Sequence, residues 1–123
     1  MQELNITIPK CDYLAFPFTY RVDGKNTQLN KDDIIYFSIK KDLTDETYIL
    51  QKTLGNGIDF DEKAQKYYVI FNYEDTEPMK MGVTYVYDLT IYYEGTQPSQ
   101  KLYGTFKIGP KVTLNKIEGW VYG

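Results

Sequence analysis

The sequence contains no histidine, and it has one cysteine, one arginine and two serines. Without histidine the chain lacks the commonest general base, metal ligand and near-neutral pH switch. A cysteine–histidine nucleophile and a zinc site built on these two residue types are both excluded within one chain. The single cysteine, Cys11, cannot form an internal disulfide, which excludes a disulfide-stapled secreted domain.

The few remaining candidates do not form a catalytic or nucleotide-binding motif. Ser38 lies inside an apolar strand pattern and Ser99 lies in a turn, so neither sits in a strand-to-helix nucleophile elbow. Arg21 alone cannot form a phosphate clamp. The scattered glycines match neither a P-loop nor a dinucleotide-binding fingerprint. We therefore expect a protein that is not an enzyme, with no catalytic residue and no cofactor.

Acidic residues cluster in four short segments, which we interpret as solvated surface that protects sheet edges from aggregation. Asp59 and Asp61 follow a glycine turn, but their spacing does not match an EF-hand loop, and we expect no metal site. A glycosidase needs two carboxyls inside a cleft, and a domain this small has little room for one. The other three segments are Asp32–Asp33, Asp42 with Asp45 and Glu46, and Glu74 with Asp75 and Glu77.

Length and composition describe one folded domain. A chain of 123 residues with 42% hydrophobic and 25% charged residues is too apolar to be disordered. No apolar run approaches the roughly 20 residues of a membrane helix, and a net charge of −3 argues against nucleic-acid binding. Met1–Lys10 lacks a basic region followed by an apolar core, so we expect no export signal.

The strongest local signal is a strict two-residue alternation, which predicts half-buried strands. It is clearest from Tyr85 to Glu94, where the inward set is Tyr85, Tyr87, Leu89, Ile91 and Tyr93. Ile35, Phe37 and Ile39 form one similar set, and Leu102, Phe106 and Ile108 form another. Seven or eight such segments, with turn signals between them, predict an all-β fold, a single Ig-like antiparallel β-sandwich. We assign residues 1–114 to this domain and residues 115–123 to a C-terminal tail.

Several single residues carry local predictions. Gly55 and Gly57 flank a sharp turn, and Gly104 marks a bulge or a close backbone approach at an inward position. Pro17 places its segment at a sheet edge or a strand entry. Residues 75–78 predict one helical turn capped by Asp75 or Thr76.

Thirteen tyrosines dominate the aromatic content, and several fall on the face opposite the core residues: Tyr36, Tyr68, Tyr92 and Tyr103. Ordinary β propensity is the favoured explanation, protein–protein packing the second and carbohydrate stacking the third. Stacking would need two or three coplanar, exposed rings. Trp120 in the tail either folds back to cap the domain, which we favour, or docks a partner, because tryptophan is enriched in interface hot spots.

A series of segments resembles small Ig-like β-sandwich proteins encoded among the structural genes of tailed phages and prophages of Gram-positive bacteria. Its layout is similar to the N-terminal domain of phage baseplate upper proteins, over roughly residues 15–114, a length typical of one domain. The segments are residues 35–45 (IYFSIKKDLTD), 50–59 (LQKTLGNGID), 71–76 (FNYEDT), 82–91 (GVTYVYDLTI) and 102–113 (LYGTFKIGPKVT).

The resemblance implies a non-enzymatic virion protein of the tail or baseplate that acts through protein–protein contacts. Its expected partners are other phage structural proteins or further copies of the chain. Its expected location is the cytoplasm during assembly and then the virion, which agrees with the unpaired Cys11. The alternative is a carbohydrate-binding or adhesin-like module that uses the tyrosine face.

Overall fold

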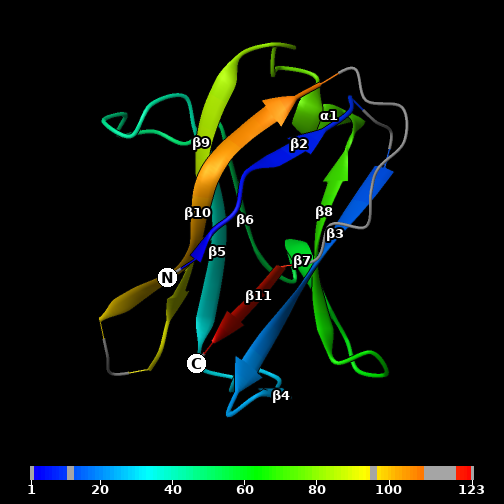
Figure 1. Cartoon of the computed structure of the whole chain (residues 1–123), viewed down its shortest axis with the longest axis vertical. Helices are drawn as coiled ribbons and strands as arrows, with labels where there is room; N and C mark the ends of the chain where they lie inside the picture. Colours follow the sequence, from blue (N-terminus) through cyan, green and yellow to red (C-terminus); the bar gives the residue numbers. More distant parts are fainter. Residues whose placement is uncertain (1, 11–12, 95–96, 110–118, 123) are drawn as a thin grey trace.

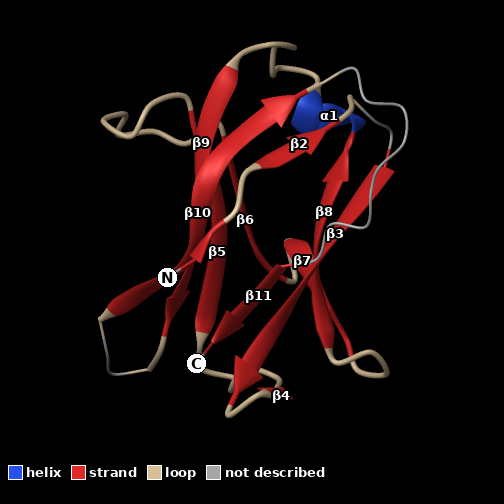
Figure 2. Cartoon of the chain, in the orientation of Figure 1, coloured by secondary structure: helices blue, strands red, loops and turns tan. Residues whose placement is uncertain are grey.

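The computed structural model describes residues 2–10, 13–94, 97–109 and 119–122, which form one curled, mixed β-sheet (Figures 1 and 2). Cys11 lies outside these residues, and so do residues 110–114 of the assigned domain and residues 115–118 and 123 of the assigned tail. The elements are β1 (Gln2–Glu3), β2 (Ile6–Ile8), β3 (Tyr13–Val22), β4 (Lys25–Asn26), β5 (Ile34–Lys40), β6 (Leu50–Leu54), β7 (Gly57–Asp61), β8 (Lys66–Asn72), α1 (Tyr73–Thr76), β9 (Thr84–Tyr92), β10 (Pro98–Ile108) and β11 (Gly119–Tyr122).

The strands follow the order β1-β10-β9-β5-β6-β7-β8-β3-β11, with β2 also paired to β10 and β4 to β3. The all-β prediction is confirmed. The prediction of purely antiparallel pairing is wrong, because β1 and β2 run parallel to β10, β6 to β7 and β11 to β3. The strands are also more numerous than the seven or eight expected, because the additional ones are too short for a periodic pattern. Within the described residues, no helix has the length and apolar character of a membrane span.

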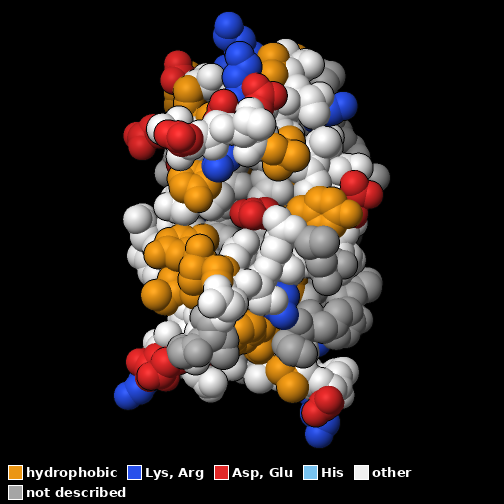
Figure 3. Space-filling view, turned by 90° about the vertical axis from the view of Figure 1, so that its left-hand side faces the viewer, with side chains coloured by type: hydrophobic (Ala, Val, Ile, Leu, Met, Phe, Trp, Pro, Cys, Tyr) orange, Lys and Arg blue, Asp and Glu red, His pale blue; other side chains and the backbone are white. Residues whose placement is uncertain are grey.

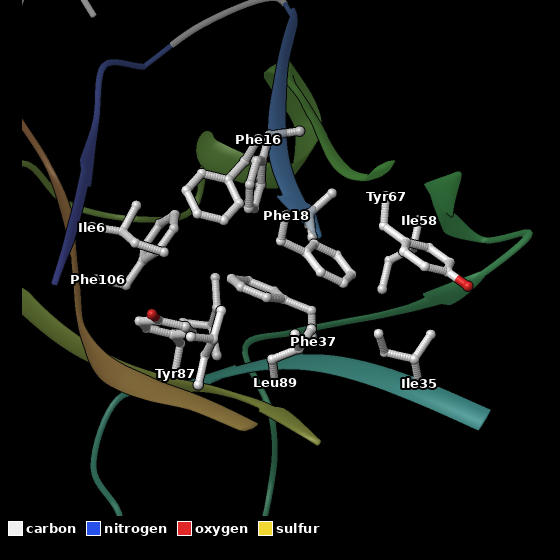
Figure 4. Packing of buried hydrophobic residues seen from close by; sticks show 14 of the residues in the cluster. Ile6, Phe16, Phe18, Ile35, Phe37, Ile58, Tyr67, Tyr87, Leu89 and Phe106 are labelled. Carbon is white, nitrogen blue, oxygen red and sulfur yellow. The ribbon is translucent and has the colours of Figure 1, made fainter. Parts of the chain in front are cut away.

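The sheet curls so that β10, β9 and β5 lie on one side of the core and β8 and β3 on the other (Figure 1). Phe37 of β5 connects the two sides: its ring stacks on Tyr87 at 5.2 Å between centroids and meets the ring of Phe71 edge-on at 5.7 Å. Deeper along the core, Phe18 stacks on Tyr67 at 5.2 Å (Figure 4). The inward residues predicted from alternation on β5, β9 and β10 are buried, as expected.

The bend from β6 to β7 depends on the glycine turn. Gly55 and Gly57 have φ of 84° and 98°, a region that residues with a side chain rarely adopt. A Cβ at Gly57 would also lie 2.6 Å from Cδ of Lys52, so the missing side chain leaves room for that buried lysine. The turn thereby lets the chain leave one side of the core and enter the other.

The predicted close approach at Gly104 is confirmed. A Cβ at Gly104 would collide with the carbonyl oxygen of Leu4 and lie 2.9 Å from Oδ1 of Asn5. The backbone N–H of Thr105 donates to the same Asn5 oxygen at 3.0 Å. The segment between β1 and β2 therefore lies directly against β10. The irregularity in β10 falls elsewhere, between Gln100 and Leu102.

Buried tyrosine hydroxyls tie strands to loops. Tyr67 accepts a hydrogen bond from the backbone N–H of Leu29 at 2.7 Å, and Tyr85 accepts one from Lys80 at 2.8 Å. Tyr87 donates to the carbonyl oxygen of Leu4 at 2.6 Å. A buried hydroxyl needs a hydrogen-bond partner, and each of these three has one in the backbone of a neighbouring segment. Their hydroxyl groups therefore stabilise the fold.

The predicted helical turn is present as α1, but its predicted cap is wrong. Asn72 is the cap: its side chain accepts from the backbone N–H of Asp75, and the Asp75 carboxylate accepts from that of Asn72. Asp75 therefore occupies the third helical position of a capping box. It also forms an ion pair with Lys52, so the expectation that this carboxylate is solvated is wrong as well.

At Pro17 the described strands leave one side of β3 unpaired, as the edge prediction requires. Pro17 lies opposite Tyr68 of β8, and the pairing with β11 begins one residue later, at Phe18. A proline has no N–H to give to a ladder, so this position on the second-to-last strand accommodates it.

Candidate binding face

The outward side chains of β5, β9 and β10 form one continuous surface, which we call the candidate binding face. The strand register sets them in rows across the sheet: Gln100, Thr90 and Tyr36 in one row, and Tyr103, Asp88 and Ser38 in the next. Because alternate residues point to opposite sides of a sheet, these rows lie opposite the buried set.

The structure brings together three of the four tyrosines predicted from the sequence. Tyr36, Tyr92 and Tyr103 all belong to the candidate binding face. Tyr68 is on β8, opposite Asp59 of β7, on the other side of the core. The backbone of Trp120 pairs with Thr19 of β3, and its side chain lies outside the described part of the chain.

One end of this face carries an apolar patch, defined as Ile34, Tyr36 and Tyr92. Ile34 and Tyr92 lie opposite each other in the register and are 46% and 42% exposed. The rings of Tyr36 and Tyr92 meet edge to face, with centroids 5.6 Å apart and planes at 89°. The patch is thus held by a specific ring contact while its outer surface remains open.

The other end carries a pocket of about 500 Å³. Its floor is the polar row of the sheet, and its walls come from the loop of residues 41–49 on one side and from β1 on the other. The residues of the floor include Ser38, Asp88, Gln100 and Tyr103, and those of the walls include Glu3, Leu43 and Tyr48. The expectation that the domain has little room for a cleft did not anticipate this pocket.

Two amide side chains fix the acceptors in the floor. Nε2 of Gln100 donates to Oδ2 of Asp88 at 3.0 Å, and Nε2 of Gln51 donates to Oγ of Ser38 at 3.2 Å. Each donor comes from the strand next to its acceptor. The carboxylate and the hydroxyl are therefore held in place before any ligand arrives, which lowers the ordering cost of binding.

Lys40 holds the loop wall against the sheet. Its Nζ donates to the carbonyl oxygen of Asp45 at 2.6 Å and lies 4.9 Å from the ring centroid of Tyr48. The Asp45 carboxylate in turn accepts from the backbone N–H of Asp42 at 3.2 Å. Tyr48 is positioned in this way although it remains 49% exposed.

The electrostatics of the pocket are acidic. Glu3 and Asp88 supply two carboxylates, whereas Lys40 is the one cation among the described lining residues and is already bonded to Asp45. Burial raises the pKa of Tyr87, and the Asp88 charge raises it further, so the Tyr87 hydroxyl stays neutral and keeps its bond to Leu4. No group of three or more metal-type ligands occurs in the described ranges.

Figure 3 views the molecule from the side of the 41–49 loop and the β9–β10 hairpin. Apolar side chains form separate patches there, and acidic side chains lie between them. Sequence reasoning missed the pocket residues Glu3, Tyr48, Asp88 and Gln100. Only Asp88 carried a signal, a charge inside the most regular strand pattern of the chain.

Comparison of the chain with family models, with curated proteins and with solved structures finds no match. The candidate binding face is therefore characterised by its own geometry.

Proposed function

We propose that this chain is a non-enzymatic module with an Ig-like sandwich architecture that works by docking onto other proteins. In an Ig-like sandwich the first, second, fourth and fifth strands form one layer, and the third, sixth and seventh form the other. If β3, β7 and β8 are the second, fourth and fifth strands and β5, β9 and β10 the third, sixth and seventh, the order β7-β8-β3 and β5-β9-β10 agrees with those two layers. The first strands differ, because β1 and β2 pair with β10.

The Tyr85 hydrogen bond supports the same architecture. Many Ig-like domains have a tyrosine near the start of the sixth strand whose hydroxyl bonds to the backbone a few residues upstream. Tyr85 is the second residue of β9, and its hydroxyl accepts from Lys80, five residues earlier. This bond holds the connection that crosses from one side of the core to the other.

The single observation that carries the docking function is the apolar patch. Ile34 and Tyr92 are nearly half exposed, and an apolar contact with another protein would remove them from water. Tyrosine suits such contacts because a rigid ring contributes a large area at a small entropic cost. By the resemblance of the sequence, the proposed partners are proteins of a phage tail or baseplate.

The test measures association directly. The chain is analysed by size-exclusion chromatography with light scattering, alone and mixed with the products of the neighbouring genes. Tyr92→Ser and Ile34→Ser are expected to abolish any complex, whereas Tyr13→Ser, at an exposed position on β3, is expected to leave it intact. A chain that stays monomeric and binds no neighbouring gene product contradicts the proposal.

The alternative, a tyrosine platform for carbohydrate, has less support at this patch. A stacking platform requires rings that share a plane, and those of Tyr36 and Tyr92 are perpendicular. Tyr103 belongs to the pocket rather than to the patch.

A further inference from the structure

We propose that the pocket between the 41–49 loop and β1 is a binding site for a neutral saccharide of one or two rings. The proposal goes beyond protein docking, because it uses the opposite end of the candidate binding face and shares no residue with the apolar patch. It rests on the size of the pocket, the fixed acceptors in its floor and the aromatic side chains around them.

The volume suits a small sugar. About 500 Å³ lies within the range of roughly 300–1,000 Å³ that small-molecule sites occupy. The floor of the pocket is formed by the strands β5, β9 and β10, and the loop wall is fastened to them through Lys40. A site built on strands keeps its geometry better than one built on loops alone.

The floor offers what sugar hydroxyls need. A hydroxyl is both donor and acceptor, and a carboxylate has lone pairs for several donors. Gln100 bonds Oδ2 of Asp88, and no hydrogen bond within the described residues occupies Oδ1. Ser38 accepts from Gln51 through its oxygen, which leaves its own hydrogen to donate. Charge-assisted bonds to such an oriented carboxylate are about twice as strong as neutral ones.

Two tyrosines supply the apolar part of the contact. Tyr48 stands on the wall and Tyr103 lies in the floor beside Asp88. A sugar ring presents C–H groups on its faces and hydroxyls at its rim, and a tyrosine offers an apolar ring with a polar tip. Rings together with a carboxylate, an amide and a hydroxyl match that mixed surface.

The charges exclude the other ligand classes of this size. A phosphate or carboxylate ligand would face Glu3 and Asp88, while the one cation of the described lining, Lys40, is bonded to Asp45. A wholly apolar ligand would remove water from Asp88, Ser38 and Gln100 without offering them hydrogen bonds. An amine ligand would bring a second positive charge beside the Lys40 ammonium, and it would leave the hydroxyl of Ser38 and the amide of Gln100 without matching partners.

The experiment uses the whole chain, labelled with ¹⁵N, and a glycan array to find candidate sugars. The labelled chain is then titrated with the methyl glycosides of glucose, galactose and N-acetylglucosamine at millimolar concentrations. We expect shift changes confined to residues of β1, β5, β9, β10 and the 41–49 loop. Inorganic phosphate and Nα-acetyl-lysine amide serve as anionic and cationic probes and are expected to leave these signals in place.

Two variants test the residues, and one matched variant controls for the surface. Tyr48→Ala and Asp88→Asn are each expected to weaken binding at least about tenfold, the loss of one aromatic contact or one charge-assisted hydrogen bond. Tyr92→Ala removes an equally exposed tyrosine from the same face but outside the pocket, and binding should not change. Since Tyr48 is on a surface loop, its variant folds even where Asp88→Asn does not.

A blank array together with no shift changes overturns the proposal. So does binding that Tyr48→Ala and Asp88→Asn leave unchanged, or binding that Tyr92→Ala weakens equally. Shifts produced by the lysine probe alone would make this a cation site instead. None of these results bears on the docking proposal, whose readout is complex size.

Discussion

Nζ of Lys52 lies 2.8 Å from Oδ2 of Asp75, and the two side chains are only 10% and 14% exposed. The ammonium also lies 5.9 Å from the centroid of the Phe71 ring. A lysine on β6 thus points inward and joins that strand to α1, across the bend of the sheet. Because both charges are largely removed from water, each depends on the other.

We expect Asp75→Ala to lower the free energy of unfolding by about 3 kcal/mol, because it leaves the ammonium of Lys52 nearly buried without its partner. It also removes the acceptor for the backbone N–H of Asn72. Lys52→Met should cost only roughly 1 kcal/mol, because the methionine fills the same space and Asp75 keeps its capping bond. Urea denaturation measures both, with the exposed Asp32→Ala as control. A cost for Asp75→Ala no larger than that for Asp32→Ala would show that the pair is not coupled as described.

Tyr85→Phe should lower the free energy of unfolding by about 1 kcal/mol, because it removes the acceptor of the partly buried hydrogen bond from the N–H of Lys80. The matched control is Tyr68→Phe, on β8, whose hydroxyl makes no hydrogen bond within the described residues. Thermal and urea denaturation of both variants give the comparison. A cost for Tyr68→Phe as large as that for Tyr85→Phe would rule out this explanation.

Gly104→Ala should cost about 1–3 kcal/mol, because the new Cβ overlaps the backbone of Leu4 and forces it away from β10. Amide hydrogen exchange should rise at Ile6–Ile8, which pair with β10 next to this contact. Gly24→Ala is the control: its Cβ meets nothing within 4 Å, so only the cost of its positive φ remains. Unchanged protection at Ile6–Ile8 would contradict the packing described.

The stability of the fold should fall as pH rises above about 10. Burial raises the pKa values of Tyr67, Tyr87 and Tyr93 above their ordinary value of 10.0. The unfolded chain then loses protons that the folded chain keeps, and each tyrosine contributes up to about 1.4 kcal/mol per pH unit. Burial lowers the pKa of Lys101, which acts in the opposite sense below pH 10.5. Urea titrations from pH 9 upward check this, and Tyr87→Phe should flatten the slope.

The regular strands could be predicted from the sequence because alternation depends only on neighbouring residues. The inward set of β9 from Tyr85 to Ile91 is an example. The short strands could not be predicted, because two or three residues are too few to show an alternation. Whether they form a strand is decided by the neighbouring strand with which they pair. Gln2–Glu3 is a strand only because β10 lies beside it. Asn72 was missed as a cap because it closes β8 as well as opening α1.

The candidate binding face was predictable in part. Alternation places Tyr36, Tyr92 and Tyr103 away from the core, and the structure agrees. Tyr68 obeys the same rule yet lies on the other side, because alternation does not say which strands are neighbours. Tyr48 could not be assigned to a site, because its loop has no period and is positioned by a lysine contact.

The parallel pairing of β11 with β3 joins residues 18–21 to residues 119–122, nearly the whole sequence apart. During synthesis β3 leaves the ribosome long before its outer neighbour exists, so that flank stays open until residues 119–122 emerge. A stop codon placed after residue 109 would keep every hairpin and still leave this flank open. Such a truncated polypeptide should unfold and aggregate more readily than the full chain. The difference in unfolding free energy between the two would measure how much β11 contributes to stability.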